Sequence, residues 1–549
     1  MKNFRGFIAG SIGSLALLVA SAHGQVTGAN VPEQNATVVL YVDKHNAQAA
    51  DSNPGTTALP LKTLGKAVEL AGINSGQQRG TKVLIAPGYY RESLAIWQQS
   101  DAPIVFEARK KGEVVVVGSD IWTGWQRQGS TNVYTHAWPY DWGMAEVPAD
   151  WRLEGEAKTA FAPVVRRREM IFVNGTHLKQ VMSSVALTAN SFYVDEALNV
   201  VSLWPAAGTN MATALVEVAV RPSLFAAFGN KNIVLRGIVF KHANSPLNAE
   251  AVRFEGASNI LIEDSRFGSN NWGGLSLGSS RNVTVRRSSA NYNGGIGMAA
   301  AFGKNFLFTD TETSSNNWRG ILGGYTGWSI AGLKHLFIHD ALYLRHKAVQ
   351  NKTLGFWLDS DSSNVTVDSA FLHDNLTFGM FIEANQGPIT VKGSVVCHNR
   401  GPGFLINNSR DVTLENNVLY GNARAQILVE GTPPDGRPMR NWETGEQFTL
   451  VSERWHIRDN DIVAKSANQL LIETNLGGST SAAWTTFQRS LTAGQNLWYQ
   501  PSGAPGFRVF GWSTETRNVD LNEWRTLTNQ DLDSVMTAPG FIDPDNHQF

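Results

Sequence analysis

Residues 232–236 read NIVLR, and this phrase of an Asn or Asp followed by alternating apolar residues returns repeatedly further along the chain. The copies are NILIE at 259–263, NVTVR at 282–286, NFLFT at 305–309, HLFIH at 335–339, NVTVD at 364–368, PITVK at 388–392 and DVTLE at 411–415, with a less regular one from Arg454. They lie about 23 residues apart, separated by Gly and Asn and without room for a crossover helix. Short strands at such a period predict an all-β fold, a parallel β-helix in which each coil stacks on the one before it.

A second strand of each coil is found by counting eight residues on from a recurring loop asparagine. The counts start at Asn270, Asn293, Asn316, Asn351, Asn375, Asn399 and Asn422 and reach Gly278, Ala301, Gly324, Asp359, Glu383, Asn407 and Glu430. Strand side chains alternate between the two faces. Apolar neighbours such as Phe356 and Leu358 therefore point inward, and the counted column points outward. Three small residues followed by four polar ones predict an open surface that ends in a polar cluster.

Asp359 and Glu383 occupy the same strand position on consecutive coils. Neighbouring strands lie about 4.8 Å apart, which predicts two carboxyl groups side by side at roughly 5 Å. Retaining glycosidases hold their two carboxyl groups about 5 to 5.5 Å apart, and inverting ones about 6.5 to 9.5 Å. Two adjacent carboxyl groups also separate each other's pKa values, so that one can stay protonated as an acid while the other is a nucleophile. A solvated acidic face or a calcium site is compatible with the same pattern.

The motifs GFWLD at 355–359 and MFIEANQGP at 380–388 resemble secreted right-handed parallel β-helix glycosidases, most closely the β-xylosidases of glycoside hydrolase family 120. Those enzymes carry a Trp-Leu-Asp strand followed about one coil later by a Phe-x-Glu strand. The resemblance implies a right-handed β-helix with Asp359 as nucleophile and Glu383 as acid/base. Gln386 stands here where the family has His. DSNPG at 51–55, RREMIFVNG at 167–175 and PGF at 539–541 also look like this wider secreted group.

Three polar residues near the pair are further candidates for substrate binding. Asp361 shares the facing of Asp359, and it is compatible with a catalytic partner, a sugar ligand or a turn cap, since Asp favours turns. Asn407 lies next to Glu383 in the column and fits either a sugar contact or a structural asparagine ladder. Glu430 lies two coils from Glu383, at roughly 10 Å by strand spacing, and is the alternative acid for an inverting enzyme.

Aromatic and basic side chains complete the predicted site. Trp357 belongs to an outward apolar row with Phe381, Leu405 and Leu428, which predicts packing beneath a covering loop with an edge that supports a sugar. Trp272 and Trp318 occupy matching turn positions and are candidate sugar platforms. Arg319, Arg345 and His346 are candidate contacts for a substrate carboxylate or hydroxyl, although residues of this kind are also common in solvated turns.

Charge and cysteine content narrow the classes of partner. The chain has 46 Lys and Arg against 47 Asp and Glu, a net charge of −1, without a basic cluster beyond Arg166, Arg167 and Arg168. Nucleic acid is therefore not an expected partner. The single cysteine, Cys397, excludes an internal disulfide and a Cys-based metal site and is interpreted as a small core residue. No cofactor or metal is expected apart from a possible calcium ion.

The chain divides into five predicted segments. Lys2 and Arg5 precede an apolar run at 8–20 and small residues near Gly24, which predicts a signal peptide over 1–24 and a secreted or periplasmic protein without a membrane span. Residues 25–118 form the first coils with a capping helix at 61–71. Residues 119–225 are an inserted β subregion with a hairpin at Asn174-Gly175, expected beside the cleft. Residues 226–480 carry the β-helix and its active-site cleft, and residues 481–549, with several Trp, cover the final coils.

These features predict an exported glycoside hydrolase of the retaining type, with a carbohydrate as its partner. The sequence leaves the sugar and the oligomeric state open. A polysaccharide lyase is the alternative, because that chemistry also uses β-helices; it requires a basic residue, and residues 345–347 are the basic cluster expected nearest the site. A non-catalytic carbohydrate-binding solenoid is the third possibility. In such a protein the polar column has no catalytic role.

Overall fold

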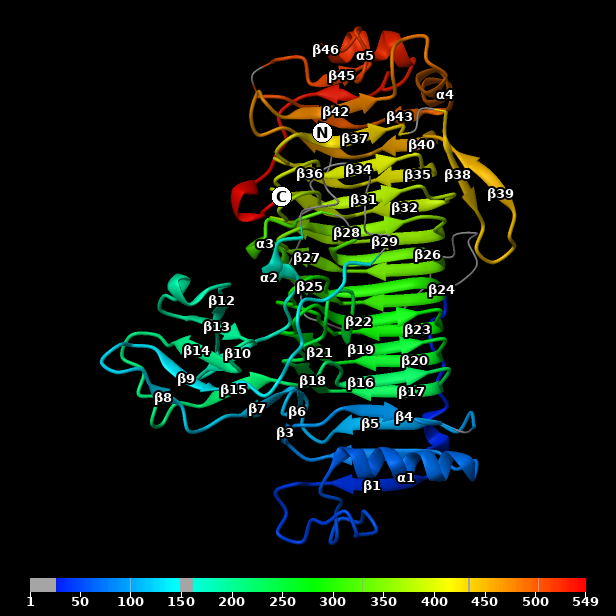
Figure 1. The fold of residues 1–549 in the computed structure, drawn as a ribbon. Coiled ribbons are helices and arrows are strands. Elements are labelled where there is room, and N and C mark those ends of the chain that lie inside the picture. Colours follow the sequence, from blue (N-terminus) through cyan, green and yellow to red (C-terminus); the bar gives the residue numbers. More distant parts are fainter. Residues whose placement is uncertain (1–25, 99, 149–160, 328, 433–434, 502) are drawn as a thin grey trace.

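The computed structural model describes residues 26–98, 100–148, 161–327, 329–432, 435–501 and 503–549. The predicted signal peptide lies outside these residues. Most strands belong to coils that are stacked along one axis (Figure 1). Each of these strands pairs in parallel with a strand of the coil before it and a strand of the coil after it. The chain is therefore a parallel β-helix, as the repeat predicts.

The strands form three stacks. The column stack, which contains Asp359 and Glu383, comprises β4 (Leu94–Ile96), β16 (Phe225–Phe228), β19 (Glu250–Glu255), β22 (Gly273–Gly278), the first halves of β24 (Met298–Thr309) and β26 (Ala331–Leu344), β28 (Leu354–Asp359), β31 (Met380–Glu383), β34 (Phe404–Asn407), β37 (Ala425–Glu430), β42 (Leu470–Asn475) and β45 (Phe507–Val509). It carries the outward column that the sequence predicts.

The repeat stack holds the NIVLR-type phrases. It comprises β1 (Val38–Val42), β2 (Thr81–Ile85), β5 (Ile104–Ala108), β17 (Lys231–Arg236), β20 (Ser258–Glu263), β23 (Arg281–Arg286), the second halves of β24 and β26, β29 (Ser363–Asp368), β32 (Ile389–Lys392), β35 (Arg410–Glu415), β40 (Glu453–Arg458) and β43 (Thr492–Gly494).

The third stack closes each coil. It comprises β3 (Gly88–Tyr90), β6 (Val114–Val117), β18 (Ile238–Lys241), β21 (Arg266–Gly268), β25 (Glu312–Ser314), β27 (Lys347–Val349), β30 (Phe371–His373), β33 (Val395–Cys397), β36 (Val418–Tyr420), β41 (Asp461–Val463), β44 (Leu497–Tyr499) and β47 (Val535–Met536). The inward side chains of the three stacks form one continuous apolar core.

The recurring loop asparagines are a buried ladder. From Asn270 to Asn422 the amide nitrogen of each donates to the side-chain oxygen of the next at 2.9 to 3.0 Å. Gln426 ends the run by accepting from Asn422 at 2.8 Å. Buried polar groups are costly unless they are hydrogen-bonded, so each asparagine satisfies its neighbour and fixes the register of successive coils.

The prediction for one copy of the repeat is wrong. Residues 335–339 were expected in the repeat stack, but β26 pairs Ala341 with Phe306 and Tyr343 with Phe308. The correct phrase is DALYL at 340–344. The cause is an excursion after Asn316 that contains α3 (Trp318–Leu322) and lengthens this coil.

The ends of the solenoid are covered. Helix α1 (Leu64–Gly76) begins at an N-cap, Thr63, and packs on the first coils, which confirms the predicted capping helix (Figure 1). At the other end α4 (Ala482–Ser490), β46 (Arg517–Val519) and α5 (Leu521–Thr528) lie over the last coils. Trp484 of α4, Trp498 of β44 and Trp524 of α5 are buried there. Trp512 is instead exposed.

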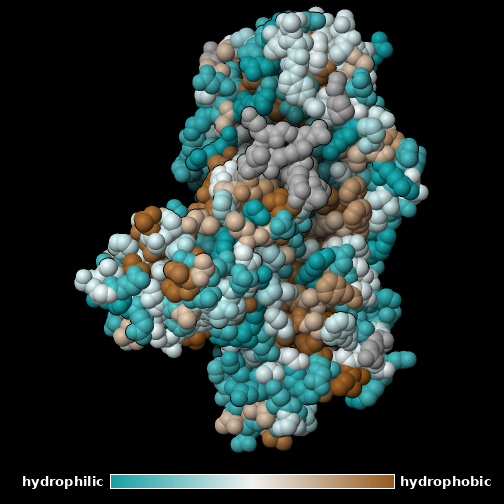
Figure 2. Space-filling view, viewed as in Figure 1, coloured by the Kyte–Doolittle hydropathy of each residue, from teal (hydrophilic) through white to brown (hydrophobic). Residues whose placement is uncertain are grey.

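The inserted β subregion protrudes from one side of the solenoid (Figures 1 and 2). Its strands are β7 (Ser119–Ile121), β8 (Gln126–Arg127), β9 (Tyr134–Ala137), β10 (Ile171–Val173), β11 (Thr176–His177), β12 (Lys179–Gln180), β13 (Ser191–Asp195), β14 (Val200–Trp204) and β15 (Val216–Ala219), accompanied by α2 (Pro163–Arg166). The hairpin predicted at Asn174-Gly175 is present between β10 and β11, and both turn residues adopt positive φ. No helix in the described ranges is long and apolar enough to cross a membrane.

Candidate functional site

Asp359 and Glu383 are direct partners on neighbouring parallel strands, at the ends of β28 and β31. The preceding residues, Leu358 and Ile382, are fully buried in the core, so alternation directs both carboxyls outward. Each of the two acids is nevertheless less than a tenth exposed. The column continues through Asn407 on the next coil.

On the other side of Asp359 the column differs from the prediction. Leu336 pairs with both Ala301 and Asp359, so it holds the position assigned to Gly324. Gly324 lies in the excursion after α3, where the count of eight residues has no strand to reach. The column therefore runs Glu255, Gly278, Ala301, Leu336, Asp359, Glu383, Asn407, Glu430 and Asn475.

Lys334 balances the charge of Asp359. It lies on β26 two residues before Leu336, and thus on the same outward face. Its Nζ is 2.9 Å from Asp359 Oδ2 and 3.4 Å from the centroid of the Trp357 ring. Both members of this ion pair are almost buried, with side chains 9% and 12% exposed. Trp357, which also stacks on Phe381, thus supports the ammonium group with its ring face.

Arg437 balances the charge of Glu383. It comes from the hairpin of β38 (Arg437–Arg440) and β39 (Gln447–Leu450), and its NH1 donates to Glu383 Oε1 at 2.5 Å. Burial and the neighbouring Asp359 charge raise the pKa of Glu383, and Arg437 and Lys334 oppose that rise. The two adjacent carboxyls therefore have different partners, and Glu383 has a strengthened tendency to carry a proton.

The hairpin is fixed to the solenoid through Asp361. This side chain is fully buried and accepts from the Trp442 backbone nitrogen at 2.7 Å and from Gln386 Nε2 at 2.6 Å. The carbonyl of Asp361 also contacts His339 Nε2 at 2.9 Å. Asp361 consequently anchors the loop that carries Arg437 and has no exposed surface for a sugar. Gln386, which replaces the family's His, is part of this anchor.

Glu443 provides a second anchor for the hairpin. Its carboxylate accepts from Arg281 at 3.1 Å and Lys304 at 2.9 Å, and contacts His339 Nδ1 at 2.8 Å. Burial alone would raise the pKa of Glu443, but these hydrogen bonds lower it to about 2. The hairpin is thus tied to three successive coils beside the carboxyl pair.

A pocket of about 560 Å³ adjoins Asp359 along the small-residue part of the column. Its walls are formed by Asn248, Glu250, Arg253, Glu255, Trp272, Ser276, Gly278, Ser279, Ile296, Ala299, Ala300, Ala301, Phe302, Ser329, Lys334, Leu336 and Asp359. A Cβ at Gly278 would clash with the Glu255 carboxylate, so glycine makes room for that carboxylate at the pocket wall, and Ala301 adds only a methyl group. The open surface predicted from these small residues is therefore a pocket that leads to Asp359.

Two features of the pocket were not predicted. Glu250 at its far side has a pKa raised to about 7 by burial, which the nearby Arg253 opposes. Phe302 at the rim is 42% exposed and stacks on Phe337 with centroids 4.6 Å apart and planes 4° from parallel. Two further hollows of about 590 and 520 Å³ lie along Phe337 and the β38–β39 hairpin.

The rings of Trp272 and Trp318 pack against other side chains and are not presented to a substrate. Trp272 is 1% exposed and packs with Val164, Val165 and Ile296, so the inserted subregion supports this wall of the pocket. Trp318 packs on Phe172 of β10 and donates to the Tyr292 carbonyl at 3.1 Å. Neither indole offers an open face at the carboxyl pair.

Arg319 and His346 are structural. Arg319 is fully buried and donates to the Val164 carbonyl at 3.0 Å and to Gln180 Oε1 at 2.8 Å, which ties α3 to the inserted subregion. Burial lowers its pKa to about 10. His346 is enclosed by the hydroxyls of Thr311 and Thr313 at 2.9 and 3.1 Å, and burial lowers its pKa to about 3. The basic residues at the carboxyl pair are instead Lys334 and Arg437.

The remaining candidates lie beyond Glu383. Asn407 is half-buried and accepts from the Thr432 backbone nitrogen at 3.2 Å. Glu430 accepts from Asn475 Nδ2 at 3.3 Å, and burial raises its pKa. Arg345 is exposed and paired with Asp310 at 2.5 Å. In the described part of the chain, the side-chain groups placed to bind a metal ion lie around His547 and the third stack rather than at Asp359.

Comparisons with known proteins agree with the architecture. The family model for the right-handed β-helix region matches residues 225–331 and 248–435. The structure of XylC in complex with xylose superposes with a TM-score of 0.65 at 15% identity, covering 92% of this chain and 87% of that one. A search of curated proteins found no match.

Two further solved structures are more distant. The mannuronan C-5 epimerase AlgE6 A-module of Azotobacter vinelandii gives a TM-score of 0.48 at 12% identity, with 86% of this chain and 95% of that one covered. A chain described as a glycoside hydrolase gives 0.42 at 13% identity, with 72% and 94% covered. The chain therefore folds as a right-handed parallel β-helix.

Proposed function

We propose that this protein is a glycoside hydrolase of the retaining type, with Asp359 as nucleophile and Glu383 as acid/base. The observation that carries the proposal is the direct pairing of these two residues on adjacent strands, each with its own cationic partner. A strand spacing of about 4.8 Å supports a carboxyl separation close to that of retaining enzymes. Their near-complete burial excludes bulk water, which strengthens electrostatic interactions with a transition state.

In the first step an oxygen of Asp359 attacks the anomeric carbon, and the glycosidic bond breaks with its electrons going to the leaving oxygen. Glu383 gives its proton to that oxygen. In the second step Glu383 takes a proton from water, whose oxygen attacks the same carbon and displaces Asp359. The raised pKa of Glu383 supports the acid role, because a buried carboxyl beside a negative charge retains its proton to higher pH.

Lys334 orients the nucleophile. Its ammonium holds one carboxylate oxygen of Asp359 at 2.9 Å, and Ser360 donates to the other at 2.9 Å. A carboxylate fixed by two donors has little freedom to rotate away from the anomeric carbon, which lowers the cost of reaching the attacking geometry.

The substrate is proposed to be a saccharide with xylose among its sugars. XylC, which shares the fold across most of both chains, was solved with xylose bound. The pocket beside Asp359 supplies carboxyl groups, a guanidinium and hydroxyls together with an aromatic rim, which suits a neutral sugar with several hydroxyls. An N-terminal segment with the features of a signal peptide supports action outside the cytoplasm on a plant or bacterial polysaccharide or on its fragments.

The proposal is tested with purified protein on aryl glycosides and on xylose-containing oligosaccharides, with the first-formed anomer followed by NMR. Retained configuration is expected, and Asp359→Asn should abolish turnover. Glu415→Gln, which removes a carboxylate on the repeat stack, is the matched control and should remain active. An inverted product, or full activity in Asp359→Asn, would refute the assignment.

A polysaccharide lyase acting on a uronate polymer is the second candidate, and a specific observation favours considering it. Lys334 and Arg437, both missed from the sequence, bring to the column the basic groups that such an enzyme needs to neutralise a uronate and abstract its proton. This reaction yields an unsaturated uronate with ultraviolet absorbance. Such a product from alginate or pectate, formed without reducing-sugar release from neutral glycosides, would replace the hydrolase assignment.

A further inference from the structure

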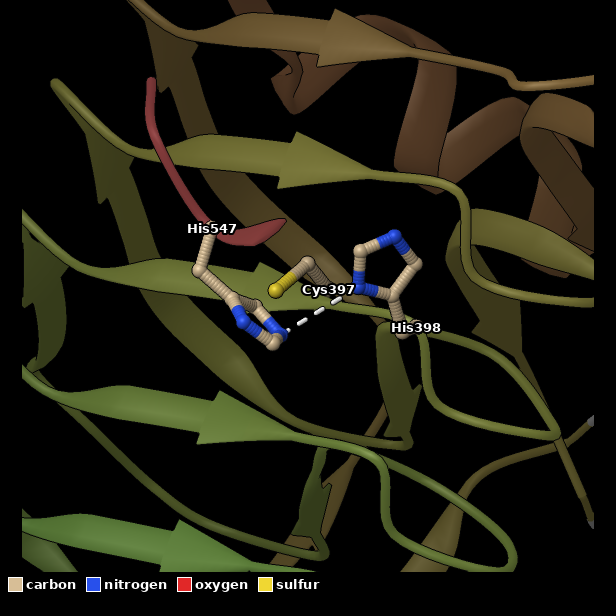
Figure 3. A group of neighbouring side chains, drawn as sticks. All are labelled: Cys397, His398 and His547. Atoms are coloured by element: carbon tan, nitrogen blue, oxygen red, sulfur yellow. Dashed lines mark hydrogen bonds between the residues drawn. The ribbon is translucent and has the colours of Figure 1, made fainter. Parts of the chain in front are cut away.

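Cys397, His398 and His547 converge on one spot at the edge of the third stack (Figure 3). Their sulfur and nitrogen atoms all lie within 4.8 Å of one another. His398 Nδ1 and His547 Nε2 are the nearest pair, at 3.4 Å. The cluster is unrelated to the carboxyl pair, which lies on the column stack.

The coil repeat itself builds this cluster. β30 and β33 are adjacent strands, and His373 is the register partner of Cys397. The residue after each, Asp374 and His398, has a positive φ of 56° and 54° and leaves the strand in the same way. His-Asp on one coil is thus stacked beneath Cys-His on the next. His547, from the segment that follows η5 (Pro544–Asn546), reaches back across both coils.

The spacing of the two histidine nitrogens matches that of a zinc ligand set. Two histidine nitrogens at about 2.05 Å from a tetrahedral Zn²⁺ ion are about 3.3 Å apart. The separation of 3.4 Å between His398 Nδ1 and His547 Nε2 agrees with that value. A thiol and two imidazoles are soft and intermediate donors, a combination that selects zinc-like transition metals over calcium or magnesium.

Two carboxylates lie beside the cluster. Asp374 Oδ2 is 3.7 Å from His547 Nε2 and 2.7 Å from His373 Nδ1. Asp545 Oδ1 is 3.5 Å from His398 Nε2. Asp545 thus contacts the nitrogen of His398 that stays free when Nδ1 binds, and a carboxylate in this position orients a ligating imidazole and fixes its tautomer. Asp374 instead contacts His547 at the nitrogen assigned to the metal, which is the position of a fourth ligand.

We propose that Cys397 Sγ, His398 Nδ1 and His547 Nε2 bind one Zn²⁺ ion, with solvent or Asp374 as the fourth ligand. The thiol proton of Cys397 is released to solvent when the sulfur binds. A count of cysteines alone argues against such a site, but one thiol and imidazoles from two distant segments supply a sufficient donor set.

The ion would clamp the segment around His547 onto the solenoid. Phe541 and Phe549 of this segment already pack against Tyr420, which also hydrogen-bonds Asp545 at 3.2 Å. Because His547 is the ligand contributed from outside the coils, metal binding stabilises the docked segment over the detached one. The predicted role is structural, and it is independent of the hydrolase proposal.

The test uses the protein without a polyhistidine tag, freed of metal by a chelator and titrated with Co²⁺. One equivalent should give tetrahedral visible bands and a thiolate-to-cobalt charge-transfer band, and Zn²⁺ should displace both. Cys397→Ser should lose the charge-transfer band. His547→Ala, at a position where the side chain is 27% exposed, should weaken binding by at least tenfold. His456→Ala, at an exposed histidine on the repeat stack, is the control.

Hydrogen exchange provides the second readout. Peptides covering 541–549 should exchange more slowly with Zn²⁺ than without it, by at least fivefold, and His547→Ala should remove the difference. The absence of stoichiometric cobalt binding, or binding lost equally in His456→Ala and His547→Ala, would overturn the proposal. Stoichiometric binding that leaves exchange of this segment unchanged would overturn the clamp.

Discussion

Replacement of Glu383 by Gln tests the two roles proposed for this residue, general acid in the first step and general base in the second. The amide has the same shape and keeps an oxygen that accepts from Arg437, so the site should hold its geometry while losing its transferable proton. General acid–base catalysis contributes about 10²- to 10⁴-fold. At 1.36 kcal/mol per decade, the expected loss for an unactivated xylo-oligosaccharide is therefore about 3 to 5 kcal/mol in activation free energy.

A 2,4-dinitrophenyl glycoside provides the internal comparison. Its leaving group departs without a proton, so Glu383→Gln should still form the glycosyl-enzyme on Asp359 and should stall at hydrolysis. Azide needs no general base, and its addition should raise turnover by roughly tenfold or more. The product should be a glycosyl azide of retained configuration, since it forms by displacement of Asp359.

The assay follows dinitrophenolate release by absorbance and identifies the azide product by NMR, with Glu415→Gln as control. Three results would refute the reasoning: more than about a tenth of wild-type activity on the unactivated substrate, no response to azide, or an inverted azide product. The last result would identify Asp359 as something other than the nucleophile.

Three further variants test the surroundings of the pair. Arg437→Met should shift the alkaline limb of kcat/KM to higher pH, because Arg437 opposes the raised pKa of Glu383 and its loss leaves the acid protonated longer; an unmoved limb would contradict this. Lys334→Met should lower the free energy of unfolding by about 3 to 5 kcal/mol by leaving Asp359 buried and unpaired, and a double variant with Asp359→Asn should recover most of it in urea denaturation. Phe302→Ala should raise KM about threefold to tenfold with kcat unchanged, as expected for loss of an aromatic contact at the rim, whereas a loss confined to kcat would place the ring elsewhere in the mechanism.

The fold could be predicted because its determinants repeat. Alternation within each strand and an asparagine at each turn recur with nearly constant spacing, and stacking turns that spacing into contacts. The count failed where the spacing changed. Between Asn316 and Asn351 the chain inserts α3 and its flanking loops, so Gly324 was assigned in place of Leu336.

The same insertion explains why half of the site was missed. Asp359 and Glu383 come from uninterrupted coils, and strand pairing alone predicts that they are neighbours. Lys334 comes from the coil whose register was misassigned, so its side chain had no predicted facing. Arg437 comes from a hairpin outside the repeat, and no periodicity relates it to Glu383.

The accessibility of the basic turn residues could not be predicted from the repeat, because non-repeating segments and core packing bury them. Arg319 lies in a turn that would be solvated in a bare solenoid, but the inserted subregion covers it and uses its guanidinium as a tether. His346 faces the core between two threonines that the turn pattern did not mark as inward. A residue's chemistry can be identified from the sequence, whereas its accessibility depends on segments packed against it.

Arg437 also distinguishes the two candidate functions. In a hydrolase, its contact with Glu383 favours the charged form of an acid that must be protonated, so a substrate entering the site has to weaken this contact before the first step. Removing the guanidinium then preserves turnover at acidic pH and extends it to higher pH. In a lyase, the guanidinium would neutralise the substrate carboxylate as charge develops beside it, and its removal would depress turnover at every pH. The pH profile of Arg437→Met, measured on the substrate that the protein turns over, therefore distinguishes these two roles of the guanidinium.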